Sequence, residues 1–187
     1  MIRGAVKADV PALLEIYAPY VRSTTITFEY DVPTEADFMS RFEGITVRYP
    51  WLVWEEDGKI LGYAYANAAF SRAAYDWDAD LSVYLDTDAR GRGIGAKLYA
   101  CLEELMSLYG YHNLYGIITG ENAASAHFHE KNGYERMGAL PAAGFKSGRW
   151  IDVYWYGKRL CAGNPPEHRP KDFAWGPEEM RILEKYT

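Results

Sequence analysis

Three glycines separate a strand-like run of the chain from a helix-like run, in the segment DARGRGIGAKLYACLEEL at residues 88–105. Glycine is unfavourable inside either element, because it loses more backbone freedom on folding than any other residue. Its missing Cβ lets successive backbone N–H groups converge on an anion, and a helix that begins there adds the positive end of its dipole. Arg90 and Arg92 can add charge-assisted hydrogen bonds. The segment therefore predicts a strand–turn–helix unit that binds an anion.

The patterns around this unit predict further strands and helices. Strands are expected at 2–6, in a hairpin at 51–70, at 76–86, at 113–119 and in two runs between 134 and 160, with a further short β-rich run at 23–30. Helices are expected to begin at the cap residues Asp9, Thr34 and Asn122, at the glycine turn and, for a short one, near Pro177.

This order of elements predicts an α/β chain. A strand meander precedes the glycine turn and a βαβ-like unit follows it, so we expect a mixed central sheet of about six to seven strands with helices on both faces. The length of 187 residues suits one domain. We place that domain at residues 1–160 and a C-terminal extension, richer in proline and polar residues, at 161–187.

Composition excludes several partners. The formal net charge of -6 argues against nucleic acid, because phosphate neutralisation needs clustered lysine and arginine. No apolar run is long enough to span a bilayer and the first residues lack a signal-peptide pattern, so we expect no membrane partner and a cytoplasmic location. Cys101 and Cys161 form no metal-spaced pair and indicate no disulfide framework, so no metal is expected.

Three anion-binding motifs compete for the glycine turn. A Walker motif fails, because no Lys-Ser or Lys-Thr pair follows the last glycine. A dinucleotide fingerprint can be placed on Gly91, Gly93 and Ala96, but the acidic residue that it needs roughly 20 positions on is missing. The third motif, Arg90-x-x-Gly93-x-Gly95, matches the Q/R-x-x-G-x-G/A signature of the GCN5-related N-acetyltransferases, and the chain resembles that family.

The resemblance extends beyond the turn. LSVYLDTDARGRGIGAKLYACLEE resembles the family's central strand, phosphate loop and helix, and ENAASAHFHEKNGYE is similar to its next helix. STTITFEY, RYPWLV, SRAAYDW, HEKNGY and AAGFKSGRWIDVYW resemble the phosphinothricin and methionine sulfoximine branch. The resemblance covers residues 1–158 and implies the acetyltransferase fold with a splayed central strand, acetyl-CoA as co-substrate and a homodimer.

The resemblance implies a catalytic carboxylate at Asp80, where the branch usually has glutamate. Strand alternation places Asp78, Asp80 and Ser82 on one face of the strand at 76–86. Because aspartate is one methylene shorter than glutamate, we expect it to act through a water. A free aspartate is a weak base, and we expect the like charges of Asp78 and Asp80, together with partial burial, to raise the pKa of one of them.

His129 is the second catalytic residue that the resemblance implies. The branch has a histidine at this helix position, where the wider family often has a tyrosine that protonates the leaving thiolate. A histidine can hold or release a proton near neutral pH. Three roles are open for it: acid for the thiolate, part of the relay that deprotonates the amine, or a structural residue of the helix.

The resemblance also implies the groups that bind acetyl-CoA, on the strand, the turn and the two following helices. These are Val83, Tyr84, Leu85, Arg90, Gly91, Arg92, Gly93, Ile94, Gly95, Ala96, Asn122 and Ser125. A bulge at 83–85 is expected to turn backbone N–H groups toward the oxyanion. Asn122 can cap its helix, contact the pantetheine, or do both.

The acceptor implied by the resemblance is the amine of a small amino-acid-like molecule of the phosphinothricin, methionine sulfoximine or methionine sulfone class. Arg72 matches an arginine near the acceptor carboxylate, for which a bidentate guanidinium is suited, and Phe28, Tyr75 and Trp150 could wall the pocket. Another amine, such as a polyamine, a drug or a protein N-terminus, is the alternative acceptor. A CoA-binding module without catalysis and a nicotinamide enzyme are the other classes.

Overall fold

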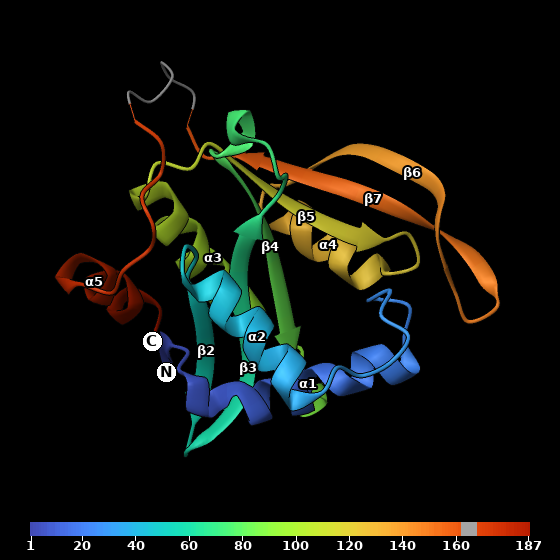
Figure 1. The fold of residues 1–187 in the computed structure, drawn as a ribbon, viewed down its shortest axis with the longest axis horizontal. Coiled ribbons are helices and arrows are strands. Elements are labelled where there is room, and N and C mark those ends of the chain that lie inside the picture. The colour runs from blue at the N-terminus through green and yellow to red at the C-terminus, as the bar shows by residue number, and fades with distance from the viewer. Residues whose placement is uncertain (162–167) are drawn as a thin grey trace.

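The computed structural model describes residues 1–161 and 168–187 of the chain. Within them, seven strands form one sheet in the order β1-β2-β3-β4-β5-β7-β6 (Figure 1). The strands are β1 (Ile2–Gly4), β2 (Trp51–Glu56), β3 (Lys59–Ala68), β4 (Asp78–Leu85), β5 (Asn113–Thr119), β6 (Glu135–Lys146) and β7 (Arg149–Arg159). The α-helices are α1 (Val10–Ser23), α2 (Glu35–Thr46), α3 (Ile94–Leu108), α4 (Ala123–Lys131) and α5 (Pro177–Tyr186).

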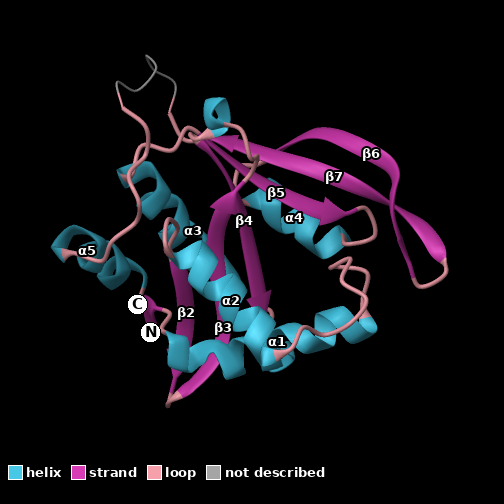
Figure 2. Cartoon of the chain, viewed as in Figure 1, coloured by secondary structure: helices cyan, strands magenta, loops and turns pink. Residues whose placement is uncertain are grey.

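The sheet is mixed, as the sequence predicts. β4 and β5 are parallel, and the other neighbouring strands are antiparallel. Helices α1 and α2 cover one face, and α3 and α4 cover the other (Figure 2). The ring of Tyr17 in α1 lies 5.0 Å from that of Tyr84 in β4, between centroids. On the opposite face, a Cβ at Gly95 of α3 would lie 3.4 Å from Leu85. The prediction of helices on both faces is confirmed.

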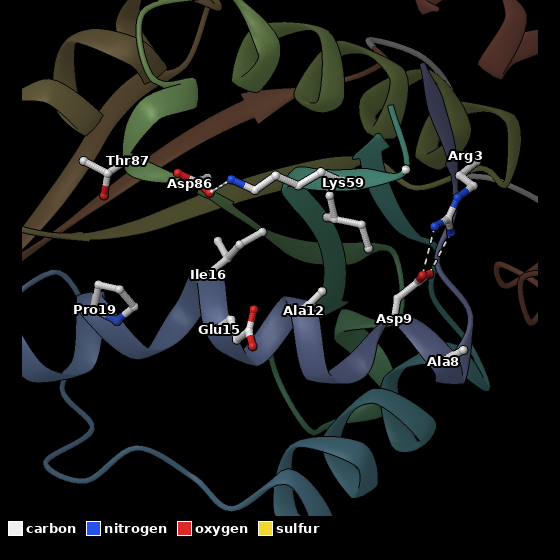
Figure 3. A pocket seen from close by; sticks show the side chains of 12 residues that line it. Arg3, Ala8, Asp9, Ala12, Glu15, Ile16, Pro19, Lys59, Asp86 and Thr87 are labelled. Carbon is white, nitrogen blue, oxygen red and sulfur yellow. Dashed lines mark hydrogen bonds and ion pairs between the residues drawn. The ribbon is translucent and has the colours of Figure 1, made fainter. Parts of the chain in front are cut away.

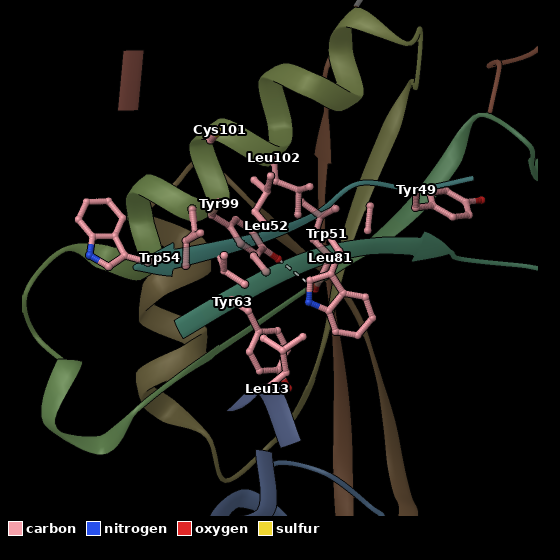
Figure 4. Close-up of a cluster of buried hydrophobic side chains, with 14 of the residues drawn as sticks. Leu13, Tyr49, Trp51, Leu52, Trp54, Tyr63, Leu81, Tyr99, Cys101 and Leu102 are labelled. Atoms are coloured by element: carbon pink, nitrogen blue, oxygen red, sulfur yellow. Dashed lines mark hydrogen bonds between the residues drawn. The ribbon is translucent and has the colours of Figure 1, made fainter. Parts of the chain in front are cut away.

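Apolar side chains pack against both faces of β2 and β3 (Figure 4). Leu13 of α1 and Leu102 of α3 are fully buried on opposite sides of these strands. The indole of Trp51 stacks on Tyr65 with the centroids 4.2 Å apart. Because each buried side chain of this size contributes about 1.5–3 kcal/mol, the core holds β3 and β4 as a rigid support for the residues that follow them.

Residues 24–30 form a loop after α1 and not the short strand that their β-rich composition predicts. The hydroxyl of Thr24 donates to Tyr20 O at 2.6 Å and accepts from Ile26 N–H at 3.1 Å. Such local bonds offer the backbone an alternative to a strand ladder, and the prediction of a strand here is wrong.

β4 and β5 diverge along their length. They pair only from Asp78 with Asn113 to Asp80 with Tyr115, although β4 continues to Leu85 and β5 to Thr119. The expected splay of the central strand is therefore confirmed. The register of β4 with β3 is constant from Ala79 to Leu85, so the splay arises without the bulge that we expect at 83–85, and that detail is wrong.

The described part of the C-terminal segment packs back onto the sheet and α3. Ile182 and Leu183 of α5 are buried in the main hydrophobic cluster. Tyr186 donates its hydroxyl to Glu104 of α3 at 2.8 Å. The indole of Trp175 lies over Gly4 of β1, where a Cβ would approach it to 2.5 Å. The segment that begins at residue 161 thus supplies part of the core.

Candidate functional site

The divergence of β4 and β5 opens a cleft of about 500 Å³. Residues of α1, β4, the glycine turn, α3, β5 and α4 line it. The sequence-predicted residues among them are Val83, Tyr84, Leu85, Arg90, Gly91, Gly93, Gly95, Ala96, Asn122, Ser125 and His129. The fold therefore brings most of the predicted cofactor residues, distant in sequence, to one cleft.

The glycine turn forms one end of this cleft. Gly91 and Gly93 have φ angles of 75° and 80°, in the left-handed region that costs other L-residues roughly 1–2 kcal/mol. Gly93 is the N-cap residue of α3, and its carbonyl accepts from Lys97 N–H at 3.1 Å. The N–H groups at residues 94–96 precede that bond and have no acceptor within the helix. Together with the helix dipole they form an anion site.

The arginines of the turn lie in different places. The guanidinium of Arg90 lies 5.0 Å from the centroid of the Tyr20 ring, beside the cleft. Arg92 instead donates two hydrogen bonds to the Glu56 carboxylate, at 2.7 and 2.9 Å, and its side chain does not line the cleft. The side chain of Ile94 is buried in the core, so this residue presents only its backbone to the anion site.

The backbone of β4 forms the side wall of the cleft. Asp86 N–H donates to Leu61 O of β3 at 2.9 Å. Because bonded residues alternate in an antiparallel ladder, the peptide groups of Tyr84 also face β3, whereas those of Val83 and Leu85 face the cleft. Within the segment 83–85 that is predicted to supply oxyanion donors, the N–H of Tyr84 therefore faces the β3 ladder and not the cleft.

The two remaining residues of this wall differ in their partners. The hydroxyl of Tyr20 donates to Leu85 O at 2.7 Å and accepts from Leu85 N–H at 3.1 Å. No such partner is found for the N–H and C=O of Val83 in the part of the chain that the structure describes. Val83 thus offers a free donor and acceptor to the cleft.

Asp80 is the last residue of β4 that pairs with β5, so it stands at the inner end of the splay. Burial raises the pKa of the Asp80 carboxyl to about 6. Asp78, whose like charge we expect to contribute, accepts a hydrogen bond from Asn113 Nδ2 at 2.8 Å and is not among the causes of the shift. Desolvation is therefore the one cause that raises the pKa of the Asp80 carboxyl into the range of a general base at neutral pH.

His129 is buried and bonded at both ring nitrogens. Its Nδ1 lies 2.7 Å from Ser125 O, which can only accept, so Nδ1 carries a proton. Its Nε2 lies 3.0 Å from the hydroxyl of Tyr99. Burial lowers the pKa of the imidazole, so the ring is neutral at pH 7 and Nε2 accepts from Tyr99.

Asn122 and Ser125 organise the start of α4. The Oδ1 of Asn122 accepts from Ser125 N–H at 3.1 Å, so the prediction that Asn122 caps its helix is confirmed. The hydroxyl of Ser125 lies 3.3 Å from His129 Nδ1. These bonds place the first turn of α4 along the cleft, opposite β4.

The four residues predicted to contact an acceptor lie outside the cleft lining, in two groups. Phe28 lies against Gly144 in β6, and Trp150 of β7 is exposed and packs on Phe145, with the centroids 5.3 Å apart. Arg72 and Tyr75 lie on the exposed segment before β4.

Tyr20, Tyr99 and Gly116 are among the cleft residues that were not predicted from the sequence. The tyrosines lie on helices at spacings typical of a core, so no pattern distinguishes them. Gly116 carries a usable signal, because a glycine inside a strand often marks a close approach. A Cβ at this position would come within 2.1 Å of His129 Nε2, so the glycine makes room for the buried imidazole.

A family model described as an acetyltransferase (GNAT) domain matches residues 2–155. The chain belongs to the GNAT acetyltransferase family. The match includes β4, the glycine turn, α3, β5 and α4, the elements that form the cleft.

The similarity of this GNAT acetyltransferase to its relatives extends over most of the chain. Phosphinothricin N-acetyltransferase of Streptomyces viridochromogenes is 34% identical over 165 residues, covering 88% of this chain and 90% of the relative. An L-methionine sulfoximine/L-methionine sulfone acetyltransferase of Pseudomonas aeruginosa is 34% identical, covering 81% and 90%. The crystal structure of a phosphinothricin acetyltransferase from Sinorhizobium meliloti in complex with AcCoA has a TM-score of 0.86 at 36% identity, covering 90% and 94%.

A second hollow of this acetyltransferase, about 460 Å³, lies beside α1 (Figure 3). Arg3 donates to both carboxylate oxygens of Asp9 there, at 2.7 and 2.9 Å, and no sequence-predicted site residue lines it. Over residues 1–161 and 168–187, no group of three or more histidine, cysteine, aspartate or glutamate side chains is placed to hold a metal ion. None of the helices in these ranges is both long and apolar enough to cross a membrane.

Proposed function

We propose that this acetyltransferase transfers the acetyl group of acetyl-CoA to the α-amine of a small amino-acid-like molecule. The observation that carries the proposal is the cleft lined by unpaired backbone donors, together with the carboxyl of Asp80, whose pKa is raised to about 6 by burial, at the last residue of β4 that pairs with β5. Relatives that are named for phosphinothricin and for methionine sulfoximine support this acceptor class.

The residues of the cleft fit acetyl-CoA. The N–H groups at residues 94–96 and the left-handed Gly91 and Gly93 form a cradle for the diphosphate, which Arg90 borders. The free C=O of Val83 offers a hydrogen bond to an amide N–H of the pantetheine. Asn122 and Ser125 line the opposite wall. When bound, acetyl-CoA supplies the thioester whose acetyl group is transferred.

Asp80 is the base that takes a proton from the ammonium group of the acceptor, directly or through a water. With a pKa of about 6, the carboxyl is mostly ionised at neutral pH and remains a stronger base than an ordinary aspartate. The N–H of Val83 faces the cleft and is suited to stabilise negative charge that develops on the carbonyl oxygen of the acyl group.

His129 is a weak candidate for the acid that protonates the leaving thiolate. Its neutral ring donates its one proton to Ser125 O, and its pKa is lowered by burial. These contacts favour a structural or relay role, in which Nε2 holds the hydroxyl of Tyr99 at the cleft.

The acceptor is held by its carboxylate on Arg72, with Phe28, Tyr75 and Trp150 around it. The exposed position of Arg72 supports this role, since no protein carboxylate among the described residues is bonded to it. An amine without a carboxylate is the second candidate acceptor, because the acidic Asp78 and Asp80 would attract a cation.

The working form is a homodimer in the cytoplasm. Both β6 and β7 carry exposed apolar side chains, including Met137, Leu140 and Trp150, and a monomer rarely exposes such groups together. Cys101 and Cys161 are both free thiols, which suits a reducing compartment. Sedimentation at several concentrations tests the dimer: one species of about twice the chain mass supports it, and a monomer at all concentrations contradicts it.

Acetylation of a matched panel tests the acceptor. The panel contains phosphinothricin, methionine sulfoximine and methionine sulfone, each beside its decarboxylated amine. We expect turnover of at least one amino acid and at least tenfold lower kcat/KM for its decarboxylated partner, because one charge-assisted contact is worth about 1.5–3 kcal/mol. Faster turnover of the decarboxylated amines would contradict the role of Arg72.

A further inference from the structure

We propose that Lys146 is a positioning residue for the acceptor: its buried ammonium group fixes the loop of residues 24–30 against the tip of the β6–β7 hairpin. We call this loop, which follows α1, the strap. Ile26 of the strap lines the cleft, and Phe28 is one of the residues proposed to surround the acceptor. The inference rests on the proposed function, because it concerns the acceptor side of the same cleft.

Lys146 holds the strap through two backbone carbonyl groups. Its Nζ donates to Val21 O at 2.9 Å and to Thr27 O at 2.8 Å. Val21 lies in the last turn of α1, where the carbonyl groups have no partner within the helix. The two carbonyls stand before and after Ile26 in the chain, so one ammonium group fixes both ends of the segment that carries this cleft residue.

The ammonium group of Lys146 is buried, and its acceptors are carbonyl groups and not a carboxylate. The residue is 6% exposed, and burial lowers the pKa of the group. The Glu29 carboxylate, which favours the charged form, pairs with Arg41. A buried charge is costly unless hydrogen bonds replace its water. The two carbonyls do this for Lys146, and the negative end of the α1 dipole adds to their effect.

The hairpin tip, which projects past the end of β5 in Figure 1, contacts the strap at two further places. Phe28 packs against Gly144 of β6, where a Cβ would come within 2.2 Å of the ring. The hydroxyl of Tyr30 donates to Phe145 O at 2.5 Å. Gly144 and Phe145 directly precede Lys146, so three successive residues of β6 hold the strap.

Glu121, which follows β5, connects the strap to the hairpin a second time. Its carboxylate accepts from the Thr25 hydroxyl at 2.9 Å and from the Arg149 guanidinium at 2.8 and 2.9 Å. These contacts are exposed, and exposed ion pairs contribute little because water screens them. Lys146 is therefore the buried fixed point of this junction.

A strap fixed in this way gives the acceptor a preformed wall. A displacement of about 1 Å in the groups that position a substrate can lower the rate 10²-fold. The proposed contacts of coenzyme A come from the glycine turn, β4 and α4, which Lys146 does not hold. Loss of the ammonium group should therefore weaken the use of the acceptor far more than the binding of coenzyme A.

Substitution Lys146→Met tests the proposal, because methionine fills a similar volume and removes the ammonium group. Amide hydrogen exchange of the strap is measured by NMR, the affinity for coenzyme A by calorimetry, and KM and kcat with the best acceptor of the panel. Lys185→Met is the matched control, since Lys185 also joins two elements, α5 and α3, through an exposed ion pair with Glu104.

Gly144→Ala tests the same junction from the side of Phe28, because the new Cβ must displace the ring. This second variant keeps the ammonium group and decides the question if Lys146→Met fails to fold. Gly138→Ala is its matched control, since Gly138 lies in the same strand and the described residues leave open space around a new Cβ there.

We expect the Ile26 amide, which donates to Thr24 Oγ1 at 3.1 Å, to exchange about tenfold faster in Lys146→Met, as the loss of one hydrogen bond implies. KM for the acceptor should rise about tenfold in Lys146→Met and in Gly144→Ala, while the affinity for coenzyme A changes less than threefold. The two control variants should match the wild type in all measurements.

Wild-type exchange and KM in Lys146→Met would overturn the inference, and so would equal losses of acceptor and coenzyme A binding, which indicate general destabilisation. If only Gly144→Ala folds, a KM equal to that of Gly138→Ala would overturn it. Failure of the wild type to acetylate any member of the panel would instead overturn the proposed acceptor class. Exchange of the Ile26 amide needs no acceptor and separates the two failures.

Discussion

The cleft between β4 and β5 and the hollow beside α1 have similar volumes, about 500 and 460 Å³, but their polar groups are satisfied differently. In the hollow, buried Asp9 accepts from Arg3 and from Val6 N–H. In the cleft, Val83 and the start of α3 present backbone groups without protein partners among the described residues. Buried polar groups are normally paired, so unmet hydrogen-bonding capacity, and not volume, distinguishes the binding site.

We expect the largest effect on catalysis at Asp80, where the pairing of β4 with β5 ends. Asp80→Asn removes the base, and kcat/KM should fall about 10³-fold, since a positioned general base contributes 10²–10⁴-fold. Steady-state kinetics measure this, with Asp78→Asn as the control, because the Asp78 carboxylate is bonded to Asn113 and has no assigned role. Equal losses in the two variants would show that strand β4 is perturbed and that Asp80 has no special function.

A smaller effect is expected at the glycine turn. Gly93→Ala forces a left-handed alanine at φ 80°, which costs roughly 1–2 kcal/mol, and coenzyme A affinity should fall about tenfold as the turn relaxes. Gly44→Ala is the control, because Gly44 lies in α2 with open space around a new Cβ and alanine favours a helix. If calorimetry finds that Gly93→Ala binds coenzyme A with unchanged affinity, the glycine turn does not contribute to binding.

In the hollow we expect an effect on stability alone. Burial raises the pKa of Asp9, but the hydrogen bonds from Arg3 and Val6 outweigh it and leave the pKa lowered. Arg3→Ala should therefore lower the free energy of unfolding by about 2 kcal/mol at pH 7 and leave coenzyme A affinity unchanged. Because a lowered carboxyl pKa stabilises above the unfolded value of 3.8, the difference should shrink as the pH falls below about 4.

Denaturant titrations at both pH values measure this effect. Lys7→Ala is the matched control, since Lys7 pairs with Glu43 at an exposed site, where an ion pair is worth about 0–1 kcal/mol. Weaker binding of coenzyme A by Arg3→Ala would mean that the hollow takes part in function.

Sequence patterns predicted the fold where local and tertiary signals agree. The glycine turn, the hairpin at Asp57-Gly58 and the cap at Asn122 lie where expected, because each needs only nearby residues to specify it. The run at 23–30 has the composition of a strand, but its threonines bond to the local backbone, and no sequence pattern weighs that competition.

The site was predictable in part for a similar reason. Motif spacing led to Gly93 and the family resemblance led to Asp80, whereas the hydrogen bonds of Tyr20 connect residues 65 positions apart and depend on the divergence of β4 and β5. Of the two causes expected for a raised pKa of Asp80, burial is confirmed, whereas the neighbouring charge of Asp78 does not contribute.

The pH dependence of kcat/KM tests the central claim, that Asp80 acts as a base whose pKa is raised by burial. The carboxyl must be ionised to accept a proton, so kcat/KM of the wild type should rise with pH through a midpoint of about 6 and then level off, and Asp80→Asn should lack this rise in its residual activity. A wild-type profile that is flat across this range, or the same rise in Asp80→Asn, would contradict the claim.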